Sequence, residues 1–77
     1  NPAKDEIEIS YTIAEIGLVS ITLLDAPGNE TIGVLNEVQT AGKHTLRVKV
    51  GWLASGMYHV RLRTTNETTT QQVNIVK

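Results

Sequence analysis

The chain lacks several kinds of residue on which small proteins often depend. Its 77 residues include no cysteine and no phenylalanine. Without cysteine, neither a disulfide nor a thiolate metal site can supplement the core of so short a chain. The only aromatic residues are Tyr11, Trp52 and Tyr58. We therefore expect one small domain whose core is mostly aliphatic.

The sequence also lacks a strong charge of either sign and long apolar runs. Seven Lys and Arg against eight Asp and Glu give a net charge of −1. This balance provides no overall field to attract nucleic acid or an anionic membrane. The apolar runs fall far short of the ~20 residues of a membrane span. We expect no nucleic-acid partner and no direct membrane insertion. Because the chain begins without an initiator Met or a signal segment, we also expect a fragment of a longer protein.

What the sequence does contain in excess is β-branched residues. It has 10 Thr, 8 Val and 7 Ile, and such side chains favour the pleated surface of a sheet. Apolar and polar residues alternate over short segments that are separated by turn residues. The pattern predicts an all-β protein, an antiparallel β-sandwich of six or seven short strands. The predicted strands cover residues 5–13, 18–25, 31–38, 44–50, 57–64 and 68–77, and Gly33 makes the third a short edge or bulged strand.

The same alternation predicts which side chains face the core. Leu18 and Leu24 fall on the opposite face of their strand, which suggests that both faces of that strand are partly covered. The predicted core residues are Ile7, Ile9, Tyr11, Ile13, Val19, Ile21, Leu23, Leu46, Val48, Val50, Tyr58, Val60, Leu62, Val73 and Ile75.

No set of residues has the spacing of a catalytic or metal centre. His44 and His59 are the only imidazoles, and neither has a second His or a carboxylate at ligand spacing. His59 falls on the outward face of its strand and is predicted to be solvated. The serines have neither a nucleophile elbow nor a partnered His, and there is no glycine-rich phosphate loop. We expect no enzyme activity, no cofactor and no metal.

Two features each allow two interpretations. Trp52, in the loop 51–56, either caps the end of the core or offers an apolar contact to a partner. Basic residues on two predicted strands either form one positive surface, if those strands are neighbours, or pair with carboxylates such as Glu6 and Glu8 or are simply solvated. These basic residues are Arg47, Lys49, His59, Arg61 and Arg63.

Five short motifs follow one another along the chain. They are the opening Asn1-Pro2, GLVSITLLDAPGNET with Asp25 and Gly28, AGKH with Gly42 and Lys43, LASGMYHVRL with Gly56 and Tyr58, and QQVNIVK with Val73, Ile75, Val76 and Lys77. In order and spacing these motifs resemble the type A C-terminal sorting domains of type IX secretion, which occur on proteins exported by Bacteroidetes, and the resemblance covers residues 1–77.

The resemblance implies a function as well as an immunoglobulin-like sandwich fold. Residues 1–77 would be a secretion signal on a longer protein, with a cargo domain on the N-terminal side. After transit through the periplasm, the type IX translocon of the outer membrane would recognise the signal and a cell-surface sortase would remove it. The cargo would remain at the cell surface or outside the cell. The oligomeric state is left open.

The residues themselves suggest how such a signal is divided between folding and recognition. Gly56 permits a tight turn into its strand, and Tyr58 is expected to bury its ring with the hydroxyl near the edge. The terminal residues 73–77 have less packing to explain their sequence. We therefore expect an exposed terminal strand that a receptor contacts, by pairing with its edge.

Two other functions remain open for the same fold. A carbohydrate-binding or adhesive module would require a cluster of exposed aromatic rings or a calcium site, for which Trp52 is the only candidate. A structural domain of the hook-capping kind would form stable homo-oligomers. Fold alone does not separate these possibilities from a sorting signal.

Overall fold

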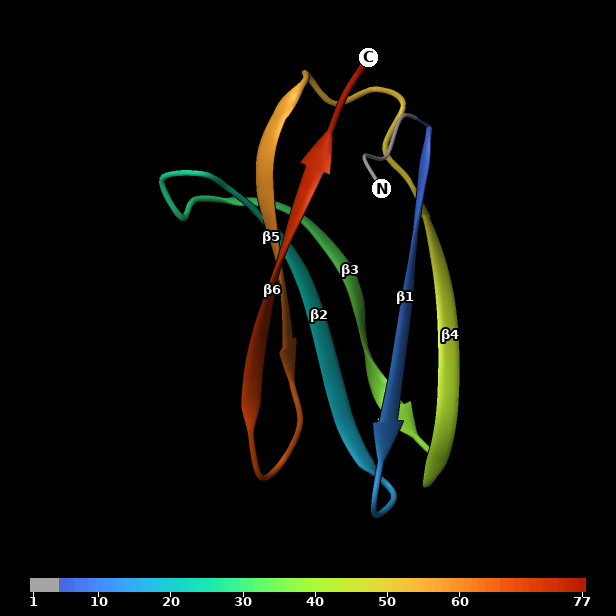
Figure 1. Cartoon of the computed structure of the whole chain (residues 1–77). Coiled ribbons are helices and arrows are strands. Elements are labelled where there is room, and N and C mark those ends of the chain that lie inside the picture. The colour runs from blue at the N-terminus through green and yellow to red at the C-terminus, as the bar shows by residue number, and fades with distance from the viewer. Residues whose placement is uncertain (1–4) are drawn as a thin grey trace.

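The computed structural model describes residues 5–77, so the opening motif Asn1-Pro2 lies outside the described residues. Six strands account for all the regular secondary structure in this range, and it contains no helix that could cross a membrane. The strands are β1 (Glu6–Ile13), β2 (Gly17–Asp25), β3 (Glu30–Gln39), β4 (Gly42–Lys49), β5 (Gly56–Arg63) and β6 (Thr68–Ile75) (Figure 1).

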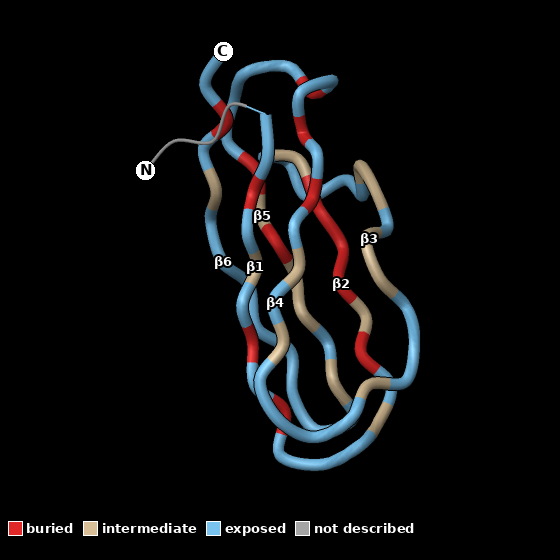
Figure 2. Tube along the Cα trace, turned by 90° about the vertical axis from the view of Figure 1, so that its right-hand side faces the viewer, coloured by how far each residue is buried: buried red, intermediate tan, exposed pale blue. Residues whose placement is uncertain are grey.

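The strands form two sheets that pack face to face. One sheet has the order β3-β2-β5-β6, the other consists of β1 and β4, and every pair is antiparallel. Figure 2 shows the two-stranded sheet in front of the larger one, with β6 and β3 toward opposite sides. The prediction of an all-β antiparallel sandwich of six or seven strands is therefore confirmed, with six.

The core lies between the sheets and is aliphatic apart from two tyrosine rings. Eleven of the predicted core residues are buried, and the other four, Ile9, Leu46, Leu62 and Val73, are half-buried and pack against them. Each fully buried Val, Leu or Ile contributes about 1.5–3 kcal/mol. The alternation did not identify Leu53, which enters this core from the loop between β4 and β5.

Strand β3 is an edge strand with two irregularities, as predicted, but it is not short. It runs for 10 residues beside β2. The register shifts between Ile21 and Thr22 and again between Leu23 and Leu24, which leaves Val34 and Thr31 without a direct partner. Pairing therefore continues past Gly33 because bulges absorb the extra residues.

The outer face of β2 is covered at one end only. Leu24 and Thr22 are buried there, whereas Leu18 is 53% exposed. Arg61 of β5 reaches across β2, and its Nη2 lies 2.9 Å from Oε1 of Glu30 on β3. The Arg61 side chain is therefore well placed to shield this end of β2, whereas no such ion pair crosses β2 near Leu18 within residues 5–77.

Candidate functional site

Two segments that are far apart in the sequence, the loop 50–56 before β5 and residues 75–77 at the end of β6, meet at one end of the sandwich, which we call the clasp end (Figure 1). The turn 25–30 after β2 lies toward the same end but projects to one side. The strand register connects them, because Asp25 lies opposite Tyr58 and Tyr58 lies opposite Val73. Most of the motif residues predicted from the sequence are therefore gathered here.

Lys77 ties the end of the last strand to the loop 50–56. Its Nζ donates to the carbonyl oxygens of Val50, at 3.0 Å, and Gly51, at 2.7 Å. Its backbone N–H donates to Oγ of Ser55 at 3.0 Å. Hydrogen bonds from a charged ammonium are stronger than neutral ones. The terminal lysine is thus part of the folded domain rather than a loose tail.

The LASGMY segment shapes the loop to which Lys77 binds. Leu53 is buried, and its N–H donates to the carbonyl of Val50 at 3.0 Å. The ring of Tyr58 is buried, and its hydroxyl donates to the carbonyl of Ala54 at 2.8 Å. A tyrosine whose hydroxyl hydrogen-bonds to the backbone a few residues upstream forms the tyrosine corner that is found in many β-sandwiches. The predicted placement of Tyr58, with its ring inside and its hydroxyl near the edge, is confirmed.

The turn after β2 depends on Asp25 and Gly28. The Asp25 carboxylate accepts from the N–H of Asn29 at 2.8 Å, and its carbonyl accepts from the N–H of Gly28 at 3.0 Å. Gly28 has a φ of 98°, and Gly42, at the start of β4, has a φ of 119°. L side chains rarely adopt such values, which accounts for glycine at both positions.

Gly42 and Lys43 lie at the other end of the molecule, so the motif residues do not form one surface. Gly42 lies opposite Ile13, and Lys43 lies opposite Thr12. Val76 is exposed at the clasp end, whereas Ile75 is only 1% exposed and belongs to the core. The prediction of an exposed terminal strand over residues 73–77 therefore holds for Val76 and Lys77 but not for Ile75, and Val73 is half-buried against the core.

A tyrosine–histidine pair stabilises the end where Gly42 lies. The rings of Tyr11 and His44 stack with centroids 5.3 Å apart. His44 Nε2 lies 2.7 Å from the carbonyl oxygen of Thr40, and the Tyr11 hydroxyl donates to Oε1 of Gln39 at 2.6 Å. Burial raises the pKa of Tyr11 above its ordinary value, and the nearby charge of Glu37 raises it further. His44 in the AGKH motif therefore has a structural role.

The idea of one positive surface is wrong. Strands β4 and β5 belong to different sheets, so Arg47 and Lys49 do not share a face with Arg61. The alternative is correct for two residues: Arg47 lies 3.5 Å from Glu6, and Arg61 lies 2.9 Å from Glu30. Because the five basic residues are divided between two sheets, they do not form the single positive surface that was considered from the sequence.

The prediction that Trp52 caps the core is also wrong. Its side chain is 62% exposed, and its Nε1 donates to the carbonyl of Lys49 at 3.2 Å. Leu53 fills the core position next to it. The reason is geometric, because the bond to Lys49 holds the Trp52 ring outside while the chain turns Leu53 inward. Trp52 is the one exposed aromatic ring, since Tyr11 and Tyr58 are buried.

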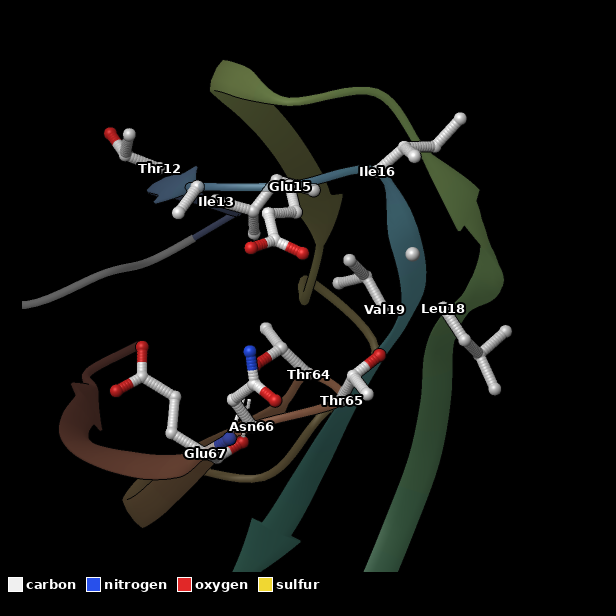
Figure 3. Close-up of a pocket in the computed structure, with 12 residues that line it drawn as sticks. Thr12, Ile13, Glu15, Ile16, Leu18, Val19, Thr64, Thr65, Asn66 and Glu67 are labelled. Atoms are coloured by element: carbon white, nitrogen blue, oxygen red, sulfur yellow. Dashed lines mark hydrogen bonds between the residues drawn. The ribbon is translucent and has the colours of Figure 1, made fainter.

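A pocket of about 340 Å³ lies at the end opposite the clasp end, between the loops 14–16 and 64–67. Figure 3 shows Glu15 pointing toward the loop 64–67, whereas Ile16 and Leu18 point away from the pocket. Its lining combines two carboxylates with hydroxyls and the Asn66 amide. Among the described residues, no group of three or more His, Asp or Glu could hold a metal ion.

Two relationships in these sites could not be read from the sequence. The contacts of Lys77 with the loop 50–56 join residues 22 to 27 positions apart, and the Tyr11–His44 stack depends on the β1–β4 register. The available signal was indirect: Ser55 and Lys77 both lie in recognisable motifs, although nothing in those motifs indicates that they touch.

The fold and the site define a small β-sandwich whose most distinctive feature is a structured chain end. The chain matches the family described as the secretion system C-terminal sorting domain over residues 1–77. It therefore belongs to this type IX secretion family, which consists of signal domains rather than catalytic ones and implies export to the cell surface or the extracellular space. Searches of curated proteins and of solved structures gave no significant match.

Proposed function

We propose that this domain acts as a folded sorting signal, which the type IX translocon recognises at the clasp end. The domain would be carried at the end of a secreted cargo, would pass through the periplasm, and would be removed at the cell surface by a sortase. Membership of the sorting-domain family over the whole chain supports this assignment. The domain itself then contributes recognition and no chemistry.

The observation that carries the proposal is the contact between two motifs. The LASGMY segment and the terminal VK residues meet where the backbone N–H of Lys77 donates to Oγ of Ser55. Nζ of Lys77 also donates to the carbonyls of Val50 and Gly51, which immediately precede that segment. Around this contact, Val76 and Trp52 expose apolar side chains. Apolar groups beside satisfied polar ones are typical of protein interfaces. A receptor that binds at the clasp end contacts both motifs at once. It can do so only when the domain is folded, because folding brings the two motifs together.

The test is a secretion assay with a reporter fused before residues 1–77 in a bacterium with type IX secretion. The wild-type fusion should reach the cell surface or the medium. Deleting residues 74–77 should leave the reporter in the periplasm, but it also removes the buried Ile75. Lys77→Met is a more specific test than the deletion, because it removes the ammonium group and keeps an unbranched side chain. We expect this variant to reduce export several-fold.

Lys49→Met is the matched control. It removes another exposed lysine beside the same loop, and we expect it to export normally. Thermal unfolding of the purified domains shows whether a variant is still folded. If Lys77→Met is folded and is exported as well as Lys49→Met, the clasp end is not the surface that is read. If the wild-type fusion is not exported, the assignment as a sorting signal fails.

A further inference from the structure

Strand β6 is an edge strand that nothing in residues 5–77 covers on its outer side. It pairs with β5 along its whole length, from Gly56 opposite Ile75 to Arg63 opposite Thr68, and it is the last strand of its sheet. In an antiparallel ladder, alternate residues of such a strand direct their N–H and C=O groups away from the partner. Figure 2 shows that β6 is exposed along most of its length.

The other three edges carry features that oppose pairing with another chain. Strand β3 has two bulges, β1 has Glu6 and Glu8, and β4 alternates cationic residues such as Arg47 and Lys49. Charges and bulges on edge strands are the usual protection against unwanted strand addition.

Strand β6 has none of this protection. Its sequence, TTTQQVNI, contains no charge and no proline, and its register with β5 is uninterrupted. Three consecutive threonines also favour extended backbone. The contacts of Lys77 and Ser55 hold the end of the strand in place, so the edge is already ordered before any partner arrives.

We propose that the open edge of β6 is a strand-addition site, at which an extended segment of the receiving protein pairs with residues 68–75 and becomes a seventh strand. This inference rests on the proposed function, because it names how the translocon holds the domain. The row of backbone donors and acceptors specifies the partner's chemistry, since another extended backbone is what satisfies it.

The side chains beside this edge add a preference for the incoming sequence. Thr69 and Gln71 lie opposite Leu62 and Val60, and they therefore share the inner face with Val73. The incoming strand places alternate side chains next to this row. We expect small or polar residues beside Thr69 and Gln71, and an apolar residue beside the half-buried Val73.

Neighbouring glutamines provide a matched pair of variants. Gln71 is on the inner face, opposite the core residue Val60, whereas Gln72 lies opposite His59 on the outer face, which still faces solvent after a strand is added. An inward lysine on an edge strand is tolerated in the isolated domain but opposes an added strand. We expect Gln71→Lys to reduce reporter export about tenfold and Gln72→Lys to change it less than twofold. Thr69→Lys is a second inner-face variant.

Hydrogen exchange of the 77-residue protein, with and without purified type IX translocon, tests the backbone pairing directly. We expect slower exchange of amides within residues 68–75 when the translocon is present. Protection confined to the loop 50–56, or equal export of Gln71→Lys and wild type, would overturn the inference while leaving the sorting function intact. If the amides of β6 become protected as the protein concentration rises in the absence of translocon, a second copy of the chain supplies the added strand. That result would also overturn the inference.

Discussion

The backbone N–H of Lys77 donates to Oγ of Ser55 at 3.0 Å, joining residues 22 positions apart. The same lysine reaches the carbonyls of Val50 and Gly51 through Nζ. Because the loop 50–56 also places Leu53 in the core, the chain end is coupled to the packing of the sandwich. The position of residues 75–77 and the folding of the domain are therefore not independent in this protein.

Tyr58→Phe should destabilise the domain by about 1 kcal/mol. The substitution keeps the buried ring but removes the hydroxyl that bonds the Ala54 carbonyl at 2.8 Å, a typical value for one such bond. In a domain of this size, the loss corresponds to a fall in the unfolding midpoint of about 4–8 °C. Trp52→Phe, at an exposed ring, should cost less than about 0.5 kcal/mol. Equal losses for the two variants in thermal unfolding would contradict the corner role of Tyr58.

Gly42→Ala should cost about 1–3 kcal/mol of unfolding free energy, because the φ of 119° is unfavourable for an L side chain. Nothing lies within 4 Å of the position that a Cβ would take, so the cost comes from the backbone rather than from a clash. Gly33→Ala is the control, since this site is also open and its φ is not positive. That variant should be neutral or slightly stabilised. Urea titration of both variants measures the difference, and a tolerated Gly42→Ala would refute this explanation.

Alkaline pH should destabilise the domain through Tyr11. Its pKa in the folded protein is raised above the ordinary value of 10.0, by burial first and by Glu37 second. Above pH 10 the unfolded chain therefore releases the tyrosine proton more readily than the folded one, and the stability contributed below that pH is lost as the pH rises through the folded pKa. Unfolding measured from pH 8 to 11 should show a shallower decline for Tyr11→Phe. Glu37→Gln should lie between that variant and wild type; identical slopes for all three would rule out Tyr11 as the cause.

The two ion pairs should differ in their contribution to stability. The Arg61 side chain is 21% exposed and lies 2.9 Å from Glu30, whereas the pair of Arg47 and Glu6 is 3.5 Å apart with side chains 68% and 43% exposed. Within the described residues, Nε of Arg61 is also buried without a partner, so losing Glu30 leaves a poorly compensated cation. Glu30→Ala should cost about 1 kcal/mol, and Glu6→Ala less than about 0.5 kcal/mol. Urea titration at low and high salt tests this ranking, and the reverse order would disprove it.

The sequence by itself determined the fold class, the core-facing residues and the positions of the turns. These depend on local properties: a period of two along a strand, the φ angles that glycine permits, and the shape of β-branched side chains. The motifs also identified the family, because their order and spacing are properties of the chain.

Which strands are neighbours was decided only by the tertiary structure. That choice placed β4 and β5 in different sheets, which separated Arg47 from Arg61, and it left β6 at an open edge. It also turned Leu53 inward and Trp52 outward, and it brought Lys77 to Ser55. The alternation of apolar and polar residues along a strand cannot specify such contacts, because it indicates which face a residue occupies and not which residue lies opposite. The neighbouring strands are selected by the energy of long-range packing.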